Sequence, residues 1–241
     1  PLRDWSLSIL GALEPTPTKQ ELEKGNNAVL EFKEFLKKIT DERRKNPGDP
    51  DTDVLTRMII AEESNLSETE LLQNCIFILN AGHETTTNLI GNALWALCTY
   101  PMVRKTLIKN PAILNSAIDE FLRFLSPNQF GNRETAFEVS LSGKKIPKNT
   151  NLHLCIGAAN RDPLQFKDPE ELIIDRTPNR HLAFAGGAHH CVGFSLAKME
   201  ARIAIGMFLK NFPNYNLISK PRWSRRIRFR GLTHLHARLE R

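Results

Sequence analysis

The chain has 241 residues, of which 41% are hydrophobic and 25% are charged, and its formal net charge is +6. This is an ordinary globular composition with enough apolar residues for a core, and no run of Lys and Arg indicates a nucleic-acid-binding arm. The four cysteines stand far apart, which excludes a disulfide framework and predicts a reducing compartment. No stretch has the length of a membrane span, so we expect a cytoplasmic protein with no membrane or nucleic-acid partner.

Helical patterns fill the first half of the chain. Residues 1–20 are predicted to be a helix end followed by a loop, and residues 19–44 carry one apolar stripe at helical spacing. A turn rich in Pro and Gly at residues 46–50 ends that helix, and a short helix is expected around residues 54–62. An Asn-Pro pair predicts the start of another helix over residues 110–125.

The longest predicted helix begins at a capping box formed by Ser67 and Glu70, and it meets no helix breaker before Tyr100 and Pro101. A helix of that length would extend about 45 Å. Its first half is apolar nearly all round, so we expect this half to be buried.

Strand signals begin after residue 127. Apolar and polar residues alternate over residues 137–146 and 152–156, and residues 213–239 are predicted to form terminal strands that include Arg226 to Arg230. A helix is expected over residues 193–209. The predicted fold class is therefore mainly α with small β-sheets (α+β).

A glycine-rich loop over residues 184–193 places Cys191 between glycines, just before the predicted helix. The N-terminus of a helix favours a thiolate over a thiol, so the loop is suited to presenting a sulfur anion. Two alternatives remain at this point: an inert cysteine in a turn, or a zinc site. The candidate zinc ligands would be His181, His189, His190 and Cys191.

The middle of the longest helix, residues 81–87, is poor helix-forming sequence because it combines a glycine with three β-branched residues. This favours a local widening or a groove, where Gly82 would let a flat ligand approach the backbone. Glu84 and Thr85 supply an acid and an alcohol, the parts of a proton relay. The alternative is a kink whose polar groups are satisfied within the protein.

Glu120 and Arg123 lie three residues apart, so they share one face of their helix. Apolar residues surround them in the sequence, which predicts at least partial burial and further ionic partners.

These three motifs, in this order and spacing, resemble the C-terminal part of a cytochrome P450 of the soluble bacterial kind. The loop resembles the family signature Phe-x-x-Gly-x-x-x-Cys-x-Gly, and the charged pair resembles the Glu-x-x-Arg motif. The middle of the longest predicted helix resembles the family pattern of a small residue, Gly, two variable residues and Thr. The matching residues are Ala81, Gly82, Thr85, Glu120, Arg123, Phe184, Gly187, Cys191 and Gly193. The resemblance covers essentially the whole chain, 1–241, as one P450 domain whose N-terminal region is missing.

The resemblance implies a haem b cofactor with Cys191 as its axial metal ligand and Phe184 shielding the sulfur. Glu84 and Thr85 would deliver protons to bound dioxygen. His189 and Arg133, and more weakly His181, match positions that bind the haem propionates, whereas His190 is expected to point away. Glu120 and Arg123, with Arg176, would form a structural cluster behind the loop. The substrate pocket would include His83, Asn128, Gln129 and Phe130.

The function implied by the resemblance is a haem-thiolate monooxygenase that hydroxylates or epoxidises a small organic substrate, with electrons from a ferredoxin and an NAD(P)H reductase. Lys198 and Arg202 are expected either to form part of the docking patch for this donor or to be an ordinary solvated face. The alternatives are a truncated, non-catalytic haem-binding remnant and a zinc-binding structural module. One departure from the signature is Ala185, where the family usually has glycine; the extra methyl is tolerated unless the backbone there needs a positive φ.

Overall fold

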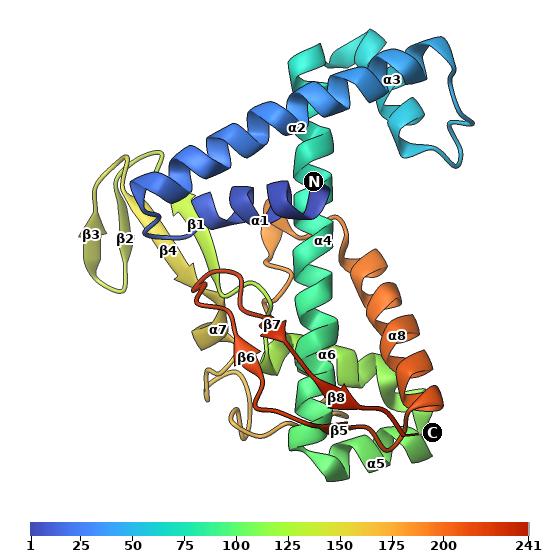
Figure 1. Cartoon of the computed structure of the whole chain (residues 1–241). Helices are drawn as coiled ribbons and strands as arrows, with labels where there is room; N and C mark the ends of the chain where they lie inside the picture. The colour runs from blue at the N-terminus through green and yellow to red at the C-terminus, as the bar shows by residue number, and fades with distance from the viewer. Residues whose placement is uncertain (241) are drawn as a thin grey trace. The chain divides into compact units, whose positions relative to one another are not determined.

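The structure, a computed structural model, describes the backbone of residues 1–240 and the side chains of residues 1–61 and 66–240. The helices are α1 (Leu2–Ala12), α2 (Lys19–Lys45), α3 (Val54–Asn65), α4 (Glu68–Thr99), α5 (Pro101–Lys109), α6 (Leu114–Phe124), α7 (Ile156–Ala159) and α8 (Phe194–Asn211). The strands are β1 (Phe130–Glu134), β2 (Val139–Leu141), β3 (Lys144–Ile146), β4 (Asn151–Cys155), β5 (Asn216–Leu217), β6 (Arg222–Trp223), β7 (Leu232–His234) and β8 (Ala237–Arg238). The predicted fold class, mainly α with small β-sheets, is confirmed (Figure 1).

Within the described residues, the strands form two-stranded antiparallel sheets that pair β1 with β4, β2 with β3, β5 with β8 and β6 with β7. The chain divides into two compact units, Pro1–Glu84 and Thr85–Arg241. None of the described helices is both long and apolar enough to cross a bilayer.

In the first unit, α1 packs along α2 (Figure 1). The ring of Trp5 stacks on that of Phe32 with 5.2 Å between centroids. A Cβ at Gly25 would lie 2.5 Å from the Cβ of Ala12, so the two helices approach closely only because residue 25 is glycine. The helix α2 starts at a capping box between Thr18 and Glu21.

The helix α4 starts at the predicted capping box, where Ser67 N–H donates to Glu70 and Glu70 N–H to Ser67 Oγ. It is one unbroken helix, and residues 81–87 stay α-helical. The prediction that its first half is buried all round is wrong, because Phe77 is 65% exposed and Ile78 51%. Among the described side chains, one face of this half packs into an apolar cluster, which contains Phe32, Leu36, Leu72 and Ile76.

The core of the second unit joins the second half of α4 to α6 and α8. Its fully buried residues include Ala93, Ala96 and Leu97 of α4, Ala117, Ile118 and Phe121 of α6, and Ala201 and Ile205 of α8. A Cβ at Gly206 would lie 3.2 Å from Leu114, so α6 and α8 pack closely there. This packing holds α6 against the helix that follows Cys191.

Some of the strand predictions are wrong. Phe137 lies outside the strands and is 68% exposed, and Ile156 begins α7. The alternating segment Arg226 to Arg230 is no strand; within it, only Phe229 makes an isolated bridge, to Asn128. The alternation there comes from arginines in a loop that crosses the chain before β1, where Gln129 N–H donates to Arg228 O at 2.7 Å.

Candidate active site

The loop around Cys191 is closed by its own backbone. Cys191 N–H donates to Phe184 O at 2.9 Å, and Ala185 N–H donates to Leu182 O at 2.8 Å. A 3₁₀ turn over Gly187–His189 lies between them, and α8 starts three residues after Cys191. Gly187 has φ +68 and Ala185 has φ +57, so both occupy the left-handed region. Ala185 is therefore in the conformation for which the signature's glycine is suited.

The environment of Cys191 is open on the glycine side. A Cβ built at Gly186 or Gly187 would meet nothing within 4 Å, and one at Gly193 would meet only the Cys191 Sγ at 4.0 Å. The neighbouring Val192 is 95% exposed. In the described part of the chain, no group of three or more His, Cys, Asp or Glu side chains could hold a metal ion. A single, partly buried sulfur beside open space suits an axial ligand of a flat cofactor better than a zinc site.

Aromatic side chains of the loop and of the residues that flank it form a connected group. The ring of the half-buried Phe184 lies 6.2 Å from that of Phe194 and 5.8 Å from that of His181, between centroids. His190 packs its ring edge-on against Phe194 at 5.0 Å. His189 is exposed in the 3₁₀ turn. Of the two histidines before Cys191, His189 is thus the one outside this aromatic group.

Glu120, Arg123 and Arg176 come together where α6 meets residues 160–179, the segment that precedes the loop in the sequence. Arg123 donates to both carboxylate oxygens of Glu120 at 2.8 Å, and both side chains are fully buried. Arg176 Nε lies 3.1 Å from Glu120 Oε2. The same carboxylate also accepts from Ile173 N–H at 2.9 Å and from Asn179 at 3.2 Å. The buried charge is therefore both paired and saturated with hydrogen bonds, as a buried ion pair requires.

The remaining donors of Arg123 bind backbone carbonyls of Asn160, Pro169 and Glu171. The fully buried Asn160 extends the network, because its amide donates to Ser126 Oγ and its Oδ1 accepts from Leu182 N–H at 2.7 Å. Asn160 and Asn179 were not predicted as members of this network, since nothing local to either residue indicates partners so far away along the chain.

Asp119, next to Glu120, accepts from two further groups. Lys198 Nζ lies 2.8 Å from its Oδ2, and His181 Nε2 lies 3.4 Å from its Oδ1. Burial alone would raise the pKa of the Asp119 carboxyl, but the hydrogen bonds and charges of His181 and Lys198 hold the pKa below its ordinary value. His181 Nδ1 accepts from Ala183 N–H at 3.3 Å. Both ring nitrogens of His181 are thus engaged within the protein, which argues against its predicted contact with a propionate.

The other predicted site residues lie on α4 and β1. On α4, Gly82 and His83 are exposed and Glu84 and Thr85 are partly buried, and a Cβ at Gly82 would meet nothing within 4 Å. Arg133 is partly buried in β1 and donates to Asn132 O at 2.7 Å. Arg202 is exposed on α8, whereas Lys198 is the partner of Asp119.

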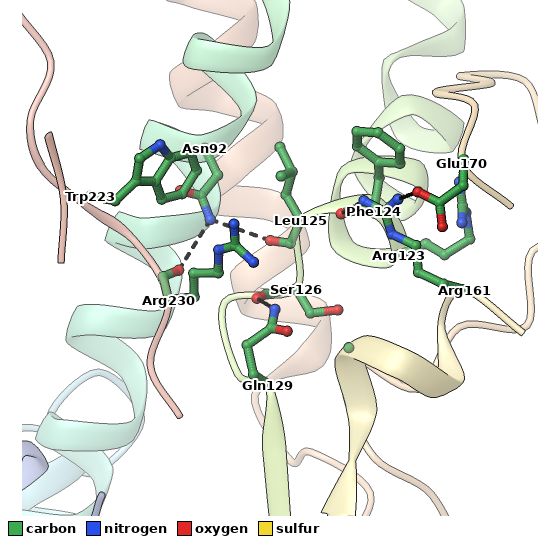
Figure 2. Close-up of a pocket in the computed structure, with 11 residues that line it drawn as sticks. Asn92, Arg123, Phe124, Leu125, Ser126, Gln129, Arg161, Glu170, Trp223 and Arg230 are labelled. Carbon is green, nitrogen blue, oxygen red and sulfur yellow. Dashed lines mark hydrogen bonds and ion pairs between the residues drawn. The ribbon is translucent and has the colours of Figure 1, made fainter. Parts of the chain in front are cut away.

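A separate pocket of about 250 Å³ lies in the second unit (Figure 2). Figure 2 shows Asn92 donating to the carbonyls of Leu125 and Arg230, and Gln129 donating to Ser126 O. Of the residues predicted for the substrate pocket, Gln129 lines this space, but Asn128 and Phe130 do not. No residue of the Cys191 loop lines it, so this pocket and the thiol are different features.

Comparisons with known proteins agree with the motifs. The cytochrome P450 family model matches residues 7–215. The biotin biosynthesis cytochrome P450 of Bacillus subtilis (strain 168) is 35% identical over 217 residues, which are 90% of this chain and 54% of that protein. The 6-deoxyerythronolide B hydroxylase of Saccharopolyspora erythraea is 33% identical over 239 residues, which are 98% of this chain and 58% of that protein.

Among solved structures, P450BioI in complex with hexadec-9Z-enoic acid ligated acyl carrier protein matches with a TM-score of 0.94 at 33% sequence identity. The match covers 99% of this chain and 61% of that chain. The chain thus spans about half the length of the curated relatives it matches.

Proposed function

Because the chain belongs to the cytochrome P450 family, as the C-terminal part of that fold, we propose that it supplies the haem-thiolate centre of a monooxygenase. The observation that carries the proposal is the loop around Cys191, which presents one partly buried sulfur beside open space at the start of α8. Haem b bound through this sulfur would supply the dioxygen chemistry, in which one oxygen atom enters an organic substrate and the other leaves as water.

The residues of the loop would hold and shield the cofactor. Cys191 would be the axial ligand, Phe184 would cover the protein side of the sulfur, and His189 and Arg133 would bind the propionates. The exposed position of His189 in the 3₁₀ turn supports this assignment. Glu120, Arg123 and Arg176 would keep the loop in place from behind, because their buried network fixes the segment that leads into it.

Protons would come from α4. Glu84 and Thr85 are adjacent on this helix and partly buried, and Gly82 next to them leaves open space beside the backbone. In the proposal, Glu84 takes up protons from solvent and the Thr85 hydroxyl passes them on. His83, Asn128, Gln129 and Phe130 stay proposed contacts of a small organic substrate.

The proposed electron donor is a ferredoxin reduced by an NAD(P)H-dependent reductase. Arg202, exposed on α8 after the loop, is a candidate contact for an acidic donor, whereas Lys198 already has a partner in Asp119. The cytoplasmic location and the extent of a single domain over residues 1–241 also stay predictions.

A second candidate is a haem-binding remnant without turnover. The observation that favours it is the apolar surface exposed on and just before α8, where Val192 is 95% exposed, Leu196 55% and Met207 60%. Large exposed apolar patches are unusual in a monomer that functions by itself.

The experiment that tests the proposal is the absorption spectrum of the reduced, carbon monoxide-bound protein after reconstitution with haem. We expect the red-shifted Soret band of thiolate ligation, and we expect Cys191→Ser to lose this band while Cys155→Ser, at an exposed free cysteine, keeps it. A colourless wild-type protein would contradict the proposal. The thiolate band without product formation would favour the remnant.

Thr85 can be tested separately once a compound that shifts the haem spectrum has been found. With a ferredoxin and its reductase, Thr85→Ala should consume electrons but release more of the consumed dioxygen as hydrogen peroxide, because the proton donor is lost. Thr87→Ala, two residues along α4, is the matched control and should keep the wild-type ratio. Equal peroxide release from both variants would remove Thr85 from the relay.

A further inference from the structure

We propose that Asp119 is a positioning residue for the Cys191 loop, which it fastens to α6 at both ends. The inference rests on the proposed function, in which Cys191 is a haem ligand. Asp119 itself touches neither the thiol nor, in this proposal, the cofactor. It acts through His181, which precedes the loop, and Lys198, which follows it on α8.

The contacts support a clamp with one shared acceptor. Lys198 Nζ lies 2.8 Å from Oδ2 and 2.7 Å from Oδ1 of the Asp119 carboxylate, and His181 Nε2 lies 3.4 Å from the same Oδ1. The side chain of His181 is 8% exposed, and those of Asp119 and Lys198 are 27% and 33% exposed. A charge pair that is shielded to this degree is screened less than a surface pair, so it is expected to restrict movement of the loop ends.

A chain of hydrogen bonds leads from this clamp to the cysteine. Asp119 holds His181, and the next residue, Leu182, donates its N–H to the buried Asn160. Leu182 O accepts from Ala185 N–H, and Phe184 O accepts from Cys191 N–H. The position of the thiol therefore depends on where the segment that starts at His181 is anchored.

The clamp is distinct from the Glu120 cluster, although the two acids are neighbours in the sequence. Successive residues of a helix point about 100° apart, so Asp119 and Glu120 face different surroundings. Glu120 binds Arg123 of α6 and Arg176, and Arg123 in turn binds backbone carbonyls of residues 160–171. Asp119 binds His181, just before the loop, and Lys198 of α8, so α6 is attached to its surroundings at two separate places.

The test uses the thiol itself as the reporter, in the full chain without added haem. The variant is Asp119→Asn, which keeps the shape of the side chain and removes its charge. Iodoacetamide modification is followed at each cysteine by peptide mass spectrometry. Cys155, which is exposed, and Cys98, which is partly buried in the core, serve as internal references. Glu200→Gln, at an exposed carboxylate on α8, is the matched control variant.

We expect Cys191 to react about fivefold faster in Asp119→Asn, because losing about 1 kcal/mol of ion-pair energy would let the loop open more often. The rates at Cys98 and Cys155, and all rates in Glu200→Gln, should stay unchanged. An unchanged rate at Cys191 would overturn the proposal. So would an equal rise at Cys98, since it would show general loosening of the second unit.

If Asp119→Asn does not fold, variants of its partner Lys198 test the proposal instead. Lys198→Met should accelerate Cys191 modification, and Lys198→Arg should restore the wild-type rate; equal rates in these two variants would contradict the clamp. In the haem-loaded protein, Asp119→Asn should also lower the fraction that shows the thiolate Soret band. A wild-type chain that binds no haem would count against the proposed function alone, because the thiol reactivity would still decide the role of Asp119.

Discussion

Glu120 and Arg123 form a completely buried bidentate ion pair, in which Arg123 Nε and Nη2 each lie 2.8 Å from one carboxylate oxygen of Glu120. The pair spans one turn of α6, and the other donors of Arg123 reach three carbonyls outside that helix. It therefore ties the secondary structure of α6 to the irregular segment that leads into the Cys191 loop.

Removing the charge of Glu120 should destabilise the protein severely. In Glu120→Gln, the guanidinium groups of Arg123 and Arg176 would remain buried without their counter-charge, which costs about 3–5 kcal/mol. Urea unfolding would measure the loss. Glu170→Gln, which removes the partner of Arg161 from a pair whose carboxylate is 73% exposed, should cost less than about 1 kcal/mol. Similar losses of unfolding free energy in both variants would show that burial does not make the Glu120 pair more important for stability than an exposed pair.

Replacing Ala185 with glycine should stabilise the protein. Its φ of +57 lies in the left-handed region, which costs a residue with a Cβ about 1–2 kcal/mol and glycine much less. Glycine loses more conformational entropy on folding than alanine does, which offsets part of this gain. Ala185→Gly should therefore raise the free energy of unfolding by about 0.5–1 kcal/mol.

The matched control for this position is Gly187→Ala in the same loop. Gly187 has φ +68, and a Cβ there would meet nothing within 4 Å, so only the backbone conformation opposes the substitution. It should lower the free energy of unfolding by about 1 kcal/mol. Shifts of the same sign in the two variants would contradict the argument from φ.

These examples show which features the sequence could predict. The helices α2, α4 and α8 and the capping box at Ser67 follow from local signals, namely apolar spacing and a side chain that can reach a nearby N–H, and the structure has them where they were expected. The helix α5 (Pro101–Lys109) was not predicted, because Pro101 was interpreted only as the end of the preceding helix. The neighbours Glu120 and Arg123 were recognisable as a pair for the same reason, because they lie one turn apart.

Features that depend on the three-dimensional surroundings were not predictable in this way. The sequence pattern makes Phe77 a core residue, but no apolar side chain among the described residues of its unit covers the face of α4 that carries it. The alternation of Arg226 to Arg230 matches a strand, yet pairing requires a neighbouring strand, and Phe229 has a bridge at one position only. The role of Asp119 has no local signal either, since its partners His181 and Lys198 lie far from it along the chain.

The contribution of Asp119 to the stability of the fold should decrease at acid pH. Although burial alone would raise the pKa of this carboxyl, its bonds to His181 and Lys198 lower the pKa below the ordinary value of 3.8. A lowered pKa means that the unfolded chain binds the proton more tightly than the folded chain does. The contribution is therefore present above about pH 4 and is lost as the pH falls through the folded-state pKa.

Urea unfolding of the wild type and of Asp119→Asn at several pH values would test this dependence. The difference in unfolding free energy between the two proteins should be largest near neutral pH and should shrink below about pH 4. A difference that stays constant with pH would mean that Asp119 acts through its shape and not through its charge.

Tyr215 should make the free energy of unfolding depend on pH at alkaline pH. Its hydroxyl donates to Leu94 O at 2.6 Å, and its side chain is 1% exposed in the core of the second unit. Burial, with a smaller effect from the neighbouring Cys98, raises the pKa of this phenol above its ordinary value of 10.0. The unfolded chain can then ionise at a pH at which the folded chain cannot, so the contribution of Tyr215 is present below pH 10 and is lost as the pH rises further.

Tyr215→Phe should therefore lower the free energy of unfolding by about 1–2 kcal/mol at neutral pH, because the buried hydrogen bond is removed. Above about pH 10 the variant should lose less stability than the wild type, so the two unfolding curves should converge. Tyr100→Phe, which removes the other phenol of the chain, is the control and should keep the alkaline loss of the wild type. Parallel loss of stability in Tyr215→Phe and the wild type would show that Tyr215 does ionise within the folded core.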